Sequence, residues 1–165
     1  MKNLTLLVFI TILVSSCGSS RKPTNTTIIG DTSVSVTAKK ATKIVDFAKK
    51  FEGTRYKFGG TDKRGMDCSG LVYVSFKEEN IALPRISRDM ATKGIPITLN
   101  ETSEGDLLFF QTNKNRRVIN HVGLVIETKK GEILFIHSTS SRGVIVSSLE
   151  EDYWKDAFVE VRRII

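Results

Sequence analysis

Residues 105–111 read Gly-Asp-Leu-Leu-Phe-Phe-Gln, and the hydrophobic pattern of the chain changes at this stretch. Four consecutive apolar residues inside it are typical of a short strand that is covered on both faces. Later segments rich in β-branched and aromatic residues have the same character: 121–127, 132–137, 144–148 and 158–162. We therefore predict five short strands, of which 106–111 is the first, in the C-terminal part of the chain.

The residues before this stretch have helical spacing instead. Apolar residues recur on one side of 41–51 and of 68–79, and Ser87 is placed to begin a short third helix that stops at Gly94. Asp67 suits the N-cap of the second helix, because its carboxylate can accept hydrogen bonds from the free N–H groups of the first turn. Helices followed by strands indicate an α+β fold, with the N-terminal helices packed on a five-stranded, mostly antiparallel sheet.

The composition is that of an ordinary globular protein, with 40% hydrophobic and 26% charged residues in a chain of 165. This length predicts a single domain that can bury its own core without disulfides. The formal charge of +7 is not concentrated in that domain, since residues 18–40 carry a net +3 and residues 41–165 another +3. No basic segment is interleaved with aromatic residues, so we expect no nucleic-acid partner.

The N-terminus has the pattern of a bacterial export signal. Residues 4–14 form an apolar run that is too short for a membrane span of about 20 residues but long enough for the core of a signal peptide. Small residues then precede Cys17. This arrangement resembles the bacterial lipobox, in which the cysteine receives lipid and becomes the new N-terminus. A plain secretory signal with an incidental cysteine is the alternative.

We accordingly divide the chain into three parts. Residues 1–16 are the expected signal peptide, residues 17–37 the lipidated cysteine and a flexible tether, and residues 38–165 the folded domain. The tether is rich in Ser, Thr, Gly and Lys, a composition that cannot bury enough apolar surface to fold. Gly18, in place of an acidic residue, favours the outer membrane. We therefore expect a cell-envelope protein held by lipid on the periplasmic face of that membrane.

Cys68 is the strongest candidate for a reactive group. It lies at the predicted start of the helix over 68–79, where the helix dipole and the free backbone N–H groups favour an anion. We expect this position to lower the pKa of the thiol and to leave N–H groups for a developing oxyanion. A thiol nucleophile also needs a base, which in such sites is a histidine brought close in space.

The chain has only two histidines, His121 and His137, and hairpin geometry predicts that they meet. If Glu127 pairs with Gly131 across a three-residue loop, the two histidines lie directly opposite each other on one face. A loop of two or four residues would shift this register. Two adjacent imidazoles suit a base and a second ring that sets the tautomer and tilt of the first.

Other roles remain open for these three residues. Cys68 can be a small packed residue, and a histidine at a strand end can be an incidental core or surface residue. A zinc site of Cys68, His121 and His137 would keep an open fourth position. Metal sites usually take two ligands from close sequence neighbours, and these three are far apart in the chain, so we expect no metal.

Five motifs resemble, in the same order, the signature of the NlpC-type cell-wall cysteine peptidases. They are Tyr-Lys-Phe-Gly-Gly at 56–60, Asp-Cys-Ser-Gly at 67–70, Gly-Asp-Leu-Leu-Phe-Phe at 105–110, His-Val-Gly at 121–123 and Phe-Ile-His-Ser at 135–138. The pairs Tyr153-Trp154 and Arg162-Arg163 resemble the ending of the small lipoprotein branch, which includes the Spr-type murein endopeptidases. The resemblance covers residues 41–165, which is nearly the whole predicted domain.

The resemblance implies a papain-like α+β fold with a catalytic set drawn from three elements. Cys68 matches the nucleophile, His121 the general base and His137 the residue that orients the base. It also implies substrate-binding roles for residues near the nucleophile, namely Tyr56, Asp67, Ser69 and Arg85. For the arginine, a structural role in packing its loop is an equal alternative.

The activity that the resemblance implies is hydrolysis of an amide bond in or between the stem peptides of peptidoglycan, by a thiol and without a cofactor. The bond is either the D-alanyl cross-link to the diamino acid, which a D,D-endopeptidase cuts, or the γ-D-glutamyl link to that diamino acid. We expect a monomer whose partners are the stem peptides and the membrane. The alternatives are a catalytically silent wall-binding lipoprotein and a papain-like lipid acyltransferase.

Overall fold

The computed structural model of the chain describes residues 29–165. The predicted signal peptide, Cys17 and the first part of the predicted tether lie outside the described residues. Within 29–165, none of the helices is both long enough and apolar enough to cross a bilayer.

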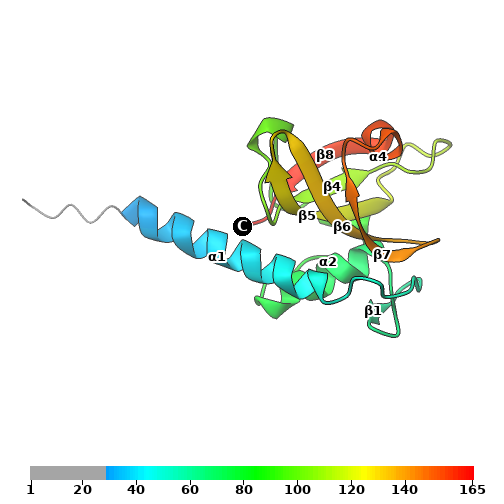
Figure 1. The fold of residues 1–165 in the computed structure, drawn as a ribbon, viewed down its shortest axis with the longest axis horizontal. Coiled ribbons are helices and arrows are strands. Elements are labelled where there is room, and N and C mark those ends of the chain that lie inside the picture. The colour runs from blue at the N-terminus through cyan, green and yellow to red at the C-terminus, as the bar shows by residue number, and fades with distance from the viewer. Residues whose placement is uncertain (1–28) are drawn as a thin grey trace, which may run out of the picture.

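Helices and strands combine in the α+β manner that the sequence predicts (Figure 1). The helices are α1 (Ile29–Lys49), α2 (Cys68–Glu78), α3 (Ser87–Met90) and α4 (Asp152–Ala157), with one 3₁₀ turn, η1 (Leu99–Glu101). The strands are β1 (Thr61–Asp62), β2 (Gly65–Met66), β3 (Ile95–Ile97), β4 (Leu107–Phe110), β5 (His121–Lys129), β6 (Glu132–Thr139), β7 (Gly143–Ser148) and β8 (Phe158–Arg163). The predicted fold class is therefore confirmed.

Six strands form one antiparallel sheet in the order β3-β8-β4-β5-β6-β7, and β1 and β2 form a separate hairpin. All five predicted strands are present, but the predicted strand number is wrong for the main sheet because β3 is a sixth. β3 contains Pro96 and pairs only with β8, at the edge of the sheet. Proline has no N–H for a ladder and is confined to such edges, so this short segment has little strand pattern to detect.

The sheet is buried on both faces, which explains the unbroken apolar run in β4. Leu107 and Phe109 pack in one cluster with the buried sides of α1 and α2. Leu108 and Phe110 belong to a second cluster, together with Trp154 of α4. Because side chains alternate along a strand, four consecutive apolar residues are divided between two cores.

The first helix is longer than the sequence predicts. We expected it to begin at residue 41, whereas α1 begins at Ile29, so residues 29–37 of the expected tether are helical. Residues 35–39 are exposed, and the N-terminal part of α1 projects from the domain in Figure 1. Once Ile44 and Val45 are packed in the core, the helix can extend toward its N-terminus without burying any further surface. Because the added turns bury no apolar face, the spacing of apolar residues in the sequence gives no sign of them.

The second helix agrees closely with the prediction. Its buried residues include the expected Leu71, Val72, Ser75 and Phe76. Asn80 follows the helix end with a φ of 59°, the left-handed conformation expected of it. The third helix differs, because α3 ends at Met90, before Gly94, and its N-cap is Ile86 with no side-chain hydrogen bond.

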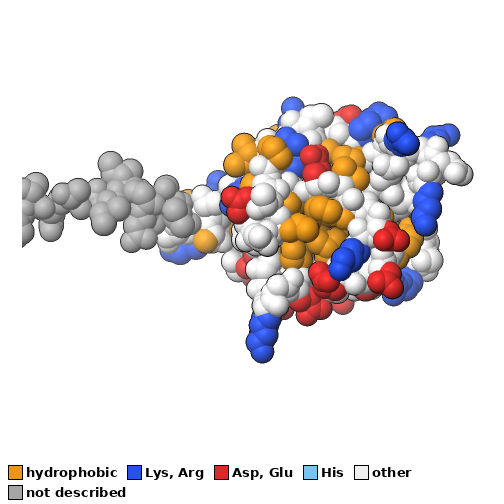
Figure 2. Space-filling view, turned by 90° about the horizontal axis from the view of Figure 1, so that it is seen from above, with side chains coloured by type: hydrophobic (Ala, Val, Ile, Leu, Met, Phe, Trp, Pro, Cys, Tyr) orange, Lys and Arg blue, Asp and Glu red, His pale blue; other side chains and the backbone are white. Residues whose placement is uncertain are grey.

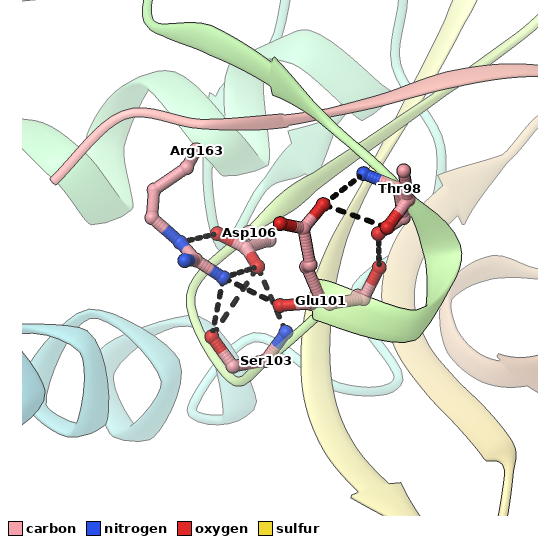
Figure 3. Close-up of polar contacts among 6 residues, drawn as sticks. Thr98, Glu101, Ser103, Asp106 and Arg163 are labelled. Carbon is pink, nitrogen blue, oxygen red and sulfur yellow. Dashed lines mark hydrogen bonds and ion pairs between the residues drawn. The ribbon is translucent and has the colours of Figure 1, made fainter.

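A buried ion pair joins the end of β8 to the start of β4 (Figure 3). The Arg163 guanidinium donates to both carboxylate oxygens of Asp106, at 2.9 and 2.7 Å, and also to Ser103 Oγ and the Glu101 carbonyl. The Asp106 side chain is only 3% exposed. The pair raises the pKa of Arg163, which therefore stays charged. It holds the turn before β4 against the last strand.

Hydrophobic side chains also reach the surface. Figure 2 shows a group of them near the centre of one face, with charged side chains around it. Ile95 of β3, Leu99 of η1 and Val159 of β8 are among the large hydrophobic residues that remain 43% to 61% exposed. Apolar atoms make up much of any protein surface, so nothing further follows from this exposure alone.

We expect Arg163→Ala to destabilise the domain by about 2–4 kcal/mol, because it leaves the buried carboxylate of Asp106 without its cation. The change is measured as the free energy of unfolding in urea. Lys129→Ala is the matched control, since it also removes a cation from a strand, but one that is exposed and forms no ion pair among residues 29–165. It should stay within about 0.5 kcal/mol of the parent chain. Equal stabilities for the two variants would contradict the prediction.

Candidate active site

Cys68 is the first residue of α2, and the predicted N-cap holds it there. The Asp67 carboxylate accepts a hydrogen bond from the Gly70 N–H at 2.6 Å and another from the Gly59 N–H at 2.7 Å. One side chain thus fixes both the first turn of the helix and the glycine loop before it. Gly70 must be glycine, because a Cβ there would collide with the Gly60 carbonyl.

Three of the predicted substrate-binding residues form one polar cluster. Arg85 donates to Ser69 Oγ at 2.9 Å and to the Gly60 carbonyl at 3.2 Å, and its guanidinium lies 2.9 Å from the Asp67 carboxylate. The segment before α3 is therefore tied to the start of α2. Arg85 thus has the contacts of a structural residue, which is the alternative to substrate binding, and its side chain stays 32% exposed.

The two histidines do meet, but not in the predicted register. The turn between β5 and β6 has two residues, Lys130 and Gly131, both at positive φ, where we expected a loop of three. An irregularity between Val125 and Glu127 then shifts the pairing. Leu124 pairs with Ile136 beyond it, and continuing this register places the two histidines as diagonal rather than direct neighbours. A shift by two residues keeps both on the same face.

The histidine rings are joined by a short hydrogen bond inside the core. His121 Nε2 lies 2.9 Å from His137 Nδ1, and both side chains are buried. On its other side, His137 Nε2 lies 3.1 Å from the hydroxyl of Ser147 on β7. Because Nε2 of His121 is engaged with its partner, Nδ1 is the ring nitrogen that remains for a substrate or thiol proton.

Ser147 and Trp154 belong to this arrangement, and the sequence analysis assigned them no role. The indole of Trp154 stacks on His121, with ring centroids 5.2 Å apart, and meets His137 edge-on at 4.5 Å. No sequence motif around a serine in a strand marks it as a partner of a histidine. The β6–β7 register, in which Phe135 pairs with Ser147, is the signal that places this hydroxyl on the face of His137.

The thiol of Cys68 lies against the start of β5. Burial raises its pKa, and the neighbouring carboxylate of Asp67 raises it further. The backbone N–H groups of Val122, Ser69 and Cys68 itself oppose this effect but do not reverse it. The expected lowering of the thiol pKa is therefore wrong in direction, because desolvation outweighs the helix N-terminus. In the resting site the thiol is protonated.

Both imidazoles are neutral in the resting site as well. Burial lowers the pKa of His121 to about 4. Burial, the neighbouring His121 and the charge of Arg142 lower the pKa of His137 to about 2. The described residues show no hydrogen bond between the thiol and a histidine ring. A neutral thiol beside a neutral imidazole can still react, with the imidazole taking the proton as the thiol attacks.

Two hollows border the candidate site. The cysteine hollow, of about 810 Å³, is lined by Cys68 and by all four predicted substrate-binding residues, Tyr56, Asp67, Ser69 and Arg85. The histidine hollow, of about 280 Å³, is lined by His121 and by residues of the β6–β7 turn and α4. Burial and the nearby Asp67 and Cys68 raise the pKa of Tyr56, so its phenol keeps its proton and can donate it in a hydrogen bond.

The candidate residues do not form a metal centre among residues 29–165, where no group of three His, Cys, Asp or Glu side chains is placed to hold an ion. The ring nitrogens that face each other in His121 and His137 are 2.9 Å apart and bonded to one another. They therefore do not converge on a third point. Such an arrangement can supply a nucleophile, a base and an orienting ring.

Comparison with known proteins identifies the family of the chain. A model of the NlpC/P60 family matches residues 53–163, which include every residue of both hollows. The chain belongs to the NlpC/P60 family. The resemblance stated from the motifs is thereby confirmed, and with it the expected papain-like fold.

Individual members of the NlpC/P60 family are similar over most of the chain. "Murein DD-endopeptidase MepS/Murein LD-carboxypeptidase" of Escherichia coli strain K12 is 36% identical over 124 residues, which are 74% of this chain and 62% of that protein. "Probable endopeptidase NlpC" of the same strain is 33% identical over 96% of this chain and 97% of its own length. A lipoprotein-like NLP/P60 protein of Staphylococcus aureus Mu50 superimposes with a TM-score of 0.67 at 32% identity, over 77% of this chain and 42% of that one.

The buried neutral histidines predict that acid destabilises this NlpC/P60 domain. In the unfolded chain both rings bind protons near pH 6.5, whereas the folded pKa values are about 4 and about 2. The stability that the two neutral histidines contribute is therefore fully present above pH 6.5. It is lost as the pH falls below that value. The limiting slope is about 1.4 kcal/mol per pH unit for each histidine.

His137→Asn should reduce this slope by about half, because one proton fewer is taken up on unfolding. The measurement is urea unfolding of both proteins across the range from about pH 7 to about pH 5. Carboxylates also titrate near the lower end, but they contribute equally to the two proteins and cancel in the difference. An unchanged slope in the variant would show that His137 is charged in the folded protein.

Proposed function

We propose that this chain is a peptidoglycan hydrolase, a cysteine peptidase that cuts an amide bond in or between murein stem peptides. The observation that carries the proposal is the placement of Cys68 at a capped helix start beside β5, whose first residue, His121, is hydrogen-bonded to His137. Two relatives with endopeptidase in their names support it. The chain spans 62% of the length of MepS, so that protein's activity is carried over here only as a proposal.

The reaction begins with a neutral thiol. His121 takes the thiol proton on Nδ1 while the sulfur attacks the substrate carbonyl, and His137 holds the other ring nitrogen. Backbone N–H groups at the start of α2 stabilise the negative oxygen, with the Tyr56 phenol as a further donor. The imidazolium of His121 then protonates the leaving nitrogen. Water attacks the thioester with His121 again as base, which releases the acid and restores the thiol.

The predicted substrate-binding residues have two kinds of role in this proposal. Tyr56 faces the cysteine hollow and is free to contact the substrate. Asp67, Ser69 and Arg85 mainly bind one another, and their first task is to hold the start of α2 in place. The exposed part of Arg85 keeps a cationic edge in the cysteine hollow, where a stem-peptide carboxylate can lie.

Among the two candidate bonds we propose the D-alanyl cross-link, which makes the chain a D,D-endopeptidase. The name of MepS supports this choice, as it includes both a DD-endopeptidase and an LD-carboxypeptidase. The γ-D-glutamyl link is the alternative bond. The catalytic residues are the same for either bond, so the hollows on the two sides of the scissile bond decide the specificity.

For the N-terminal region we propose a signal peptide over 1–16 and a lipid on Cys17, followed by a tether that leads into α1. The lipid would anchor the chain to the periplasmic face of the outer membrane, with the domain acting on the wall as a monomer. The support is the run of small residues before Cys17 and the glycine after it.

The lipid proposal predicts that the mature chain is attached to the membrane only when Cys17 is present. In bacterial cells, the parent chain should incorporate labelled palmitate and sediment with membranes, whereas Cys17→Ser should do neither. Cys68→Ser is the matched control, because it removes the other thiol of the chain and should be labelled like the parent. Equal labelling of all three chains, or of none, would contradict lipidation at Cys17.

The hydrolase proposal is tested by mass spectrometry of muropeptides incubated with the full chain in detergent. Cross-linked dimers should turn into monomers with the parent chain and with Cys17→Ser, but not with Cys68→Ala, which lacks the nucleophile. Stems that end at glutamate would instead mark the γ-D-glutamyl link as the bond that is cut. If every muropeptide stays intact, the hydrolase proposal is contradicted. The better hypothesis is then a wall-binding protein or a lipid acyltransferase.

A further inference from the structure

The part of the substrate that the histidine hollow binds has not yet been assigned. It is separate from the cysteine hollow, but both border the loop after β4, since Thr112 lines one and Asn113 the other. A substrate that lies along this loop therefore extends from the cysteine hollow into the histidine hollow. The reacting bond would lie between them, since Cys68 lines one hollow and His121 the other.

The chemistry of amide cleavage decides which half of the substrate enters which hollow. The acyl half becomes bonded to the sulfur of Cys68, so it lies in the cysteine hollow. His121 must protonate the leaving nitrogen, so the amine half lies within reach of its ring. The histidine hollow is therefore where the leaving half of the substrate is held.

The charged groups of the histidine hollow are Arg142 and Glu151. The Glu151 carboxylate accepts a hydrogen bond from the Ser148 backbone N–H at 2.9 Å, which engages it at the start of α4. Arg142 is exposed and forms no ion pair with any residue of 29–165. Its guanidinium is thus the one cation of this hollow, and it is free to bind an anion.

The backbone that carries Arg142 is held in a tight turn. The Arg142 N–H donates to Thr139 Oγ1 at 3.1 Å, and Thr139 pairs with Gly143 across the turn. Gly143 has a φ of 70° and no room for a Cβ, which would collide with the Thr54 carbonyl. Ser140 and Ser141 of the same turn also line the hollow. A guanidinium with hydroxyl donors around it suits a carboxylate.

We propose that the histidine hollow is the leaving-group subsite and that Arg142 binds a carboxylate on the carbon that bears the leaving nitrogen. The proposal rests on the peptidoglycan hydrolase function proposed above and names the substrate class of that site. The substrate is an amide whose amine half is an amino acid with a free carboxylate next to the nitrogen.

The need for a free carboxylate next to the leaving nitrogen distinguishes the candidate bonds from one another. In a cross-link to a diamino acid with two carboxyl groups, the carbon that bears the leaving nitrogen has a free carboxylate. The terminal D-alanine of a tetrapeptide stem has one as well, so the same site would also trim that residue. At the γ-D-glutamyl link of a stem with four residues, the corresponding carboxyl group is itself an amide. Arg142 therefore favours the cross-link and the stem terminus over the γ-D-glutamyl bond.

The test compares two cross-linked muropeptide dimers that differ only at this carboxyl group, which is free in one and a carboxamide in the other. With the full chain in detergent, we expect kcat/KM for the free carboxylate to be higher by on the order of 10- to 100-fold. Arg142→Gln should remove this preference by slowing cleavage of the carboxylate dimer alone. Arg142→Lys should retain part of it, because lysine keeps the charge without the planar fork.

Arg117→Gln is the matched control, since Arg117 is exposed on the loop after β4 but lines neither hollow, and the preference should persist in it. Alkylation of Cys68 by iodoacetamide at the parent rate shows that the nucleophile of each variant is intact. Equal cleavage of both dimers by the parent chain, or a preference that survives in Arg142→Gln, would overturn the subsite. A parent chain that cuts neither dimer while Cys68 still reacts would overturn the hydrolase function itself, and the subsite with it.

Discussion

The carboxylate of Asp67 is the interaction on which the geometry of the site depends. It accepts hydrogen bonds from the backbone of Gly59 and Gly70 and forms an ion pair with Arg85. The glycine loop, the start of α2 and the segment before α3 are thereby fixed around one nearly buried anion, and Cys68 lies directly beside it. The same charge raises the pKa of the thiol. Burial is the larger cause of the raised pKa, so the residue that holds Cys68 in place adds to an effect that burial begins.

Burial has the corresponding effect on the base. His121 and His137 are packed among aromatic rings and are neutral in the folded protein. The hydroxyl of Ser147 occupies the far nitrogen of His137, so a chain of hydrogen bonds from β7 to β5 leaves a single nitrogen of His121 for the substrate. In the proposed mechanism, charge develops only during the reaction, where the surrounding dipoles are already oriented to receive it.

Much of this could be predicted from the sequence because it depends on local patterns. The N-cap at Asp67, the helix that starts at Cys68 and the five longer strands each have a signature within a few residues. The meeting of the histidines was predicted on the correct face but in the wrong register, because a two-residue turn and a local irregularity have no clear sign in the sequence. Ser147, β3 and α4 were missed since their placement depends on tertiary packing.

The length of α1 has a mechanical consequence. A straight helix of 21 residues is about 30 Å long, and its buried residues Ala41, Ile44, Val45 and Ala48 lie in its C-terminal half. The N-terminal end of α1 therefore lies away from the sheet (Figure 1). A pull or a turn applied at the N-terminal end of this helix is passed along it to the domain as a change in orientation.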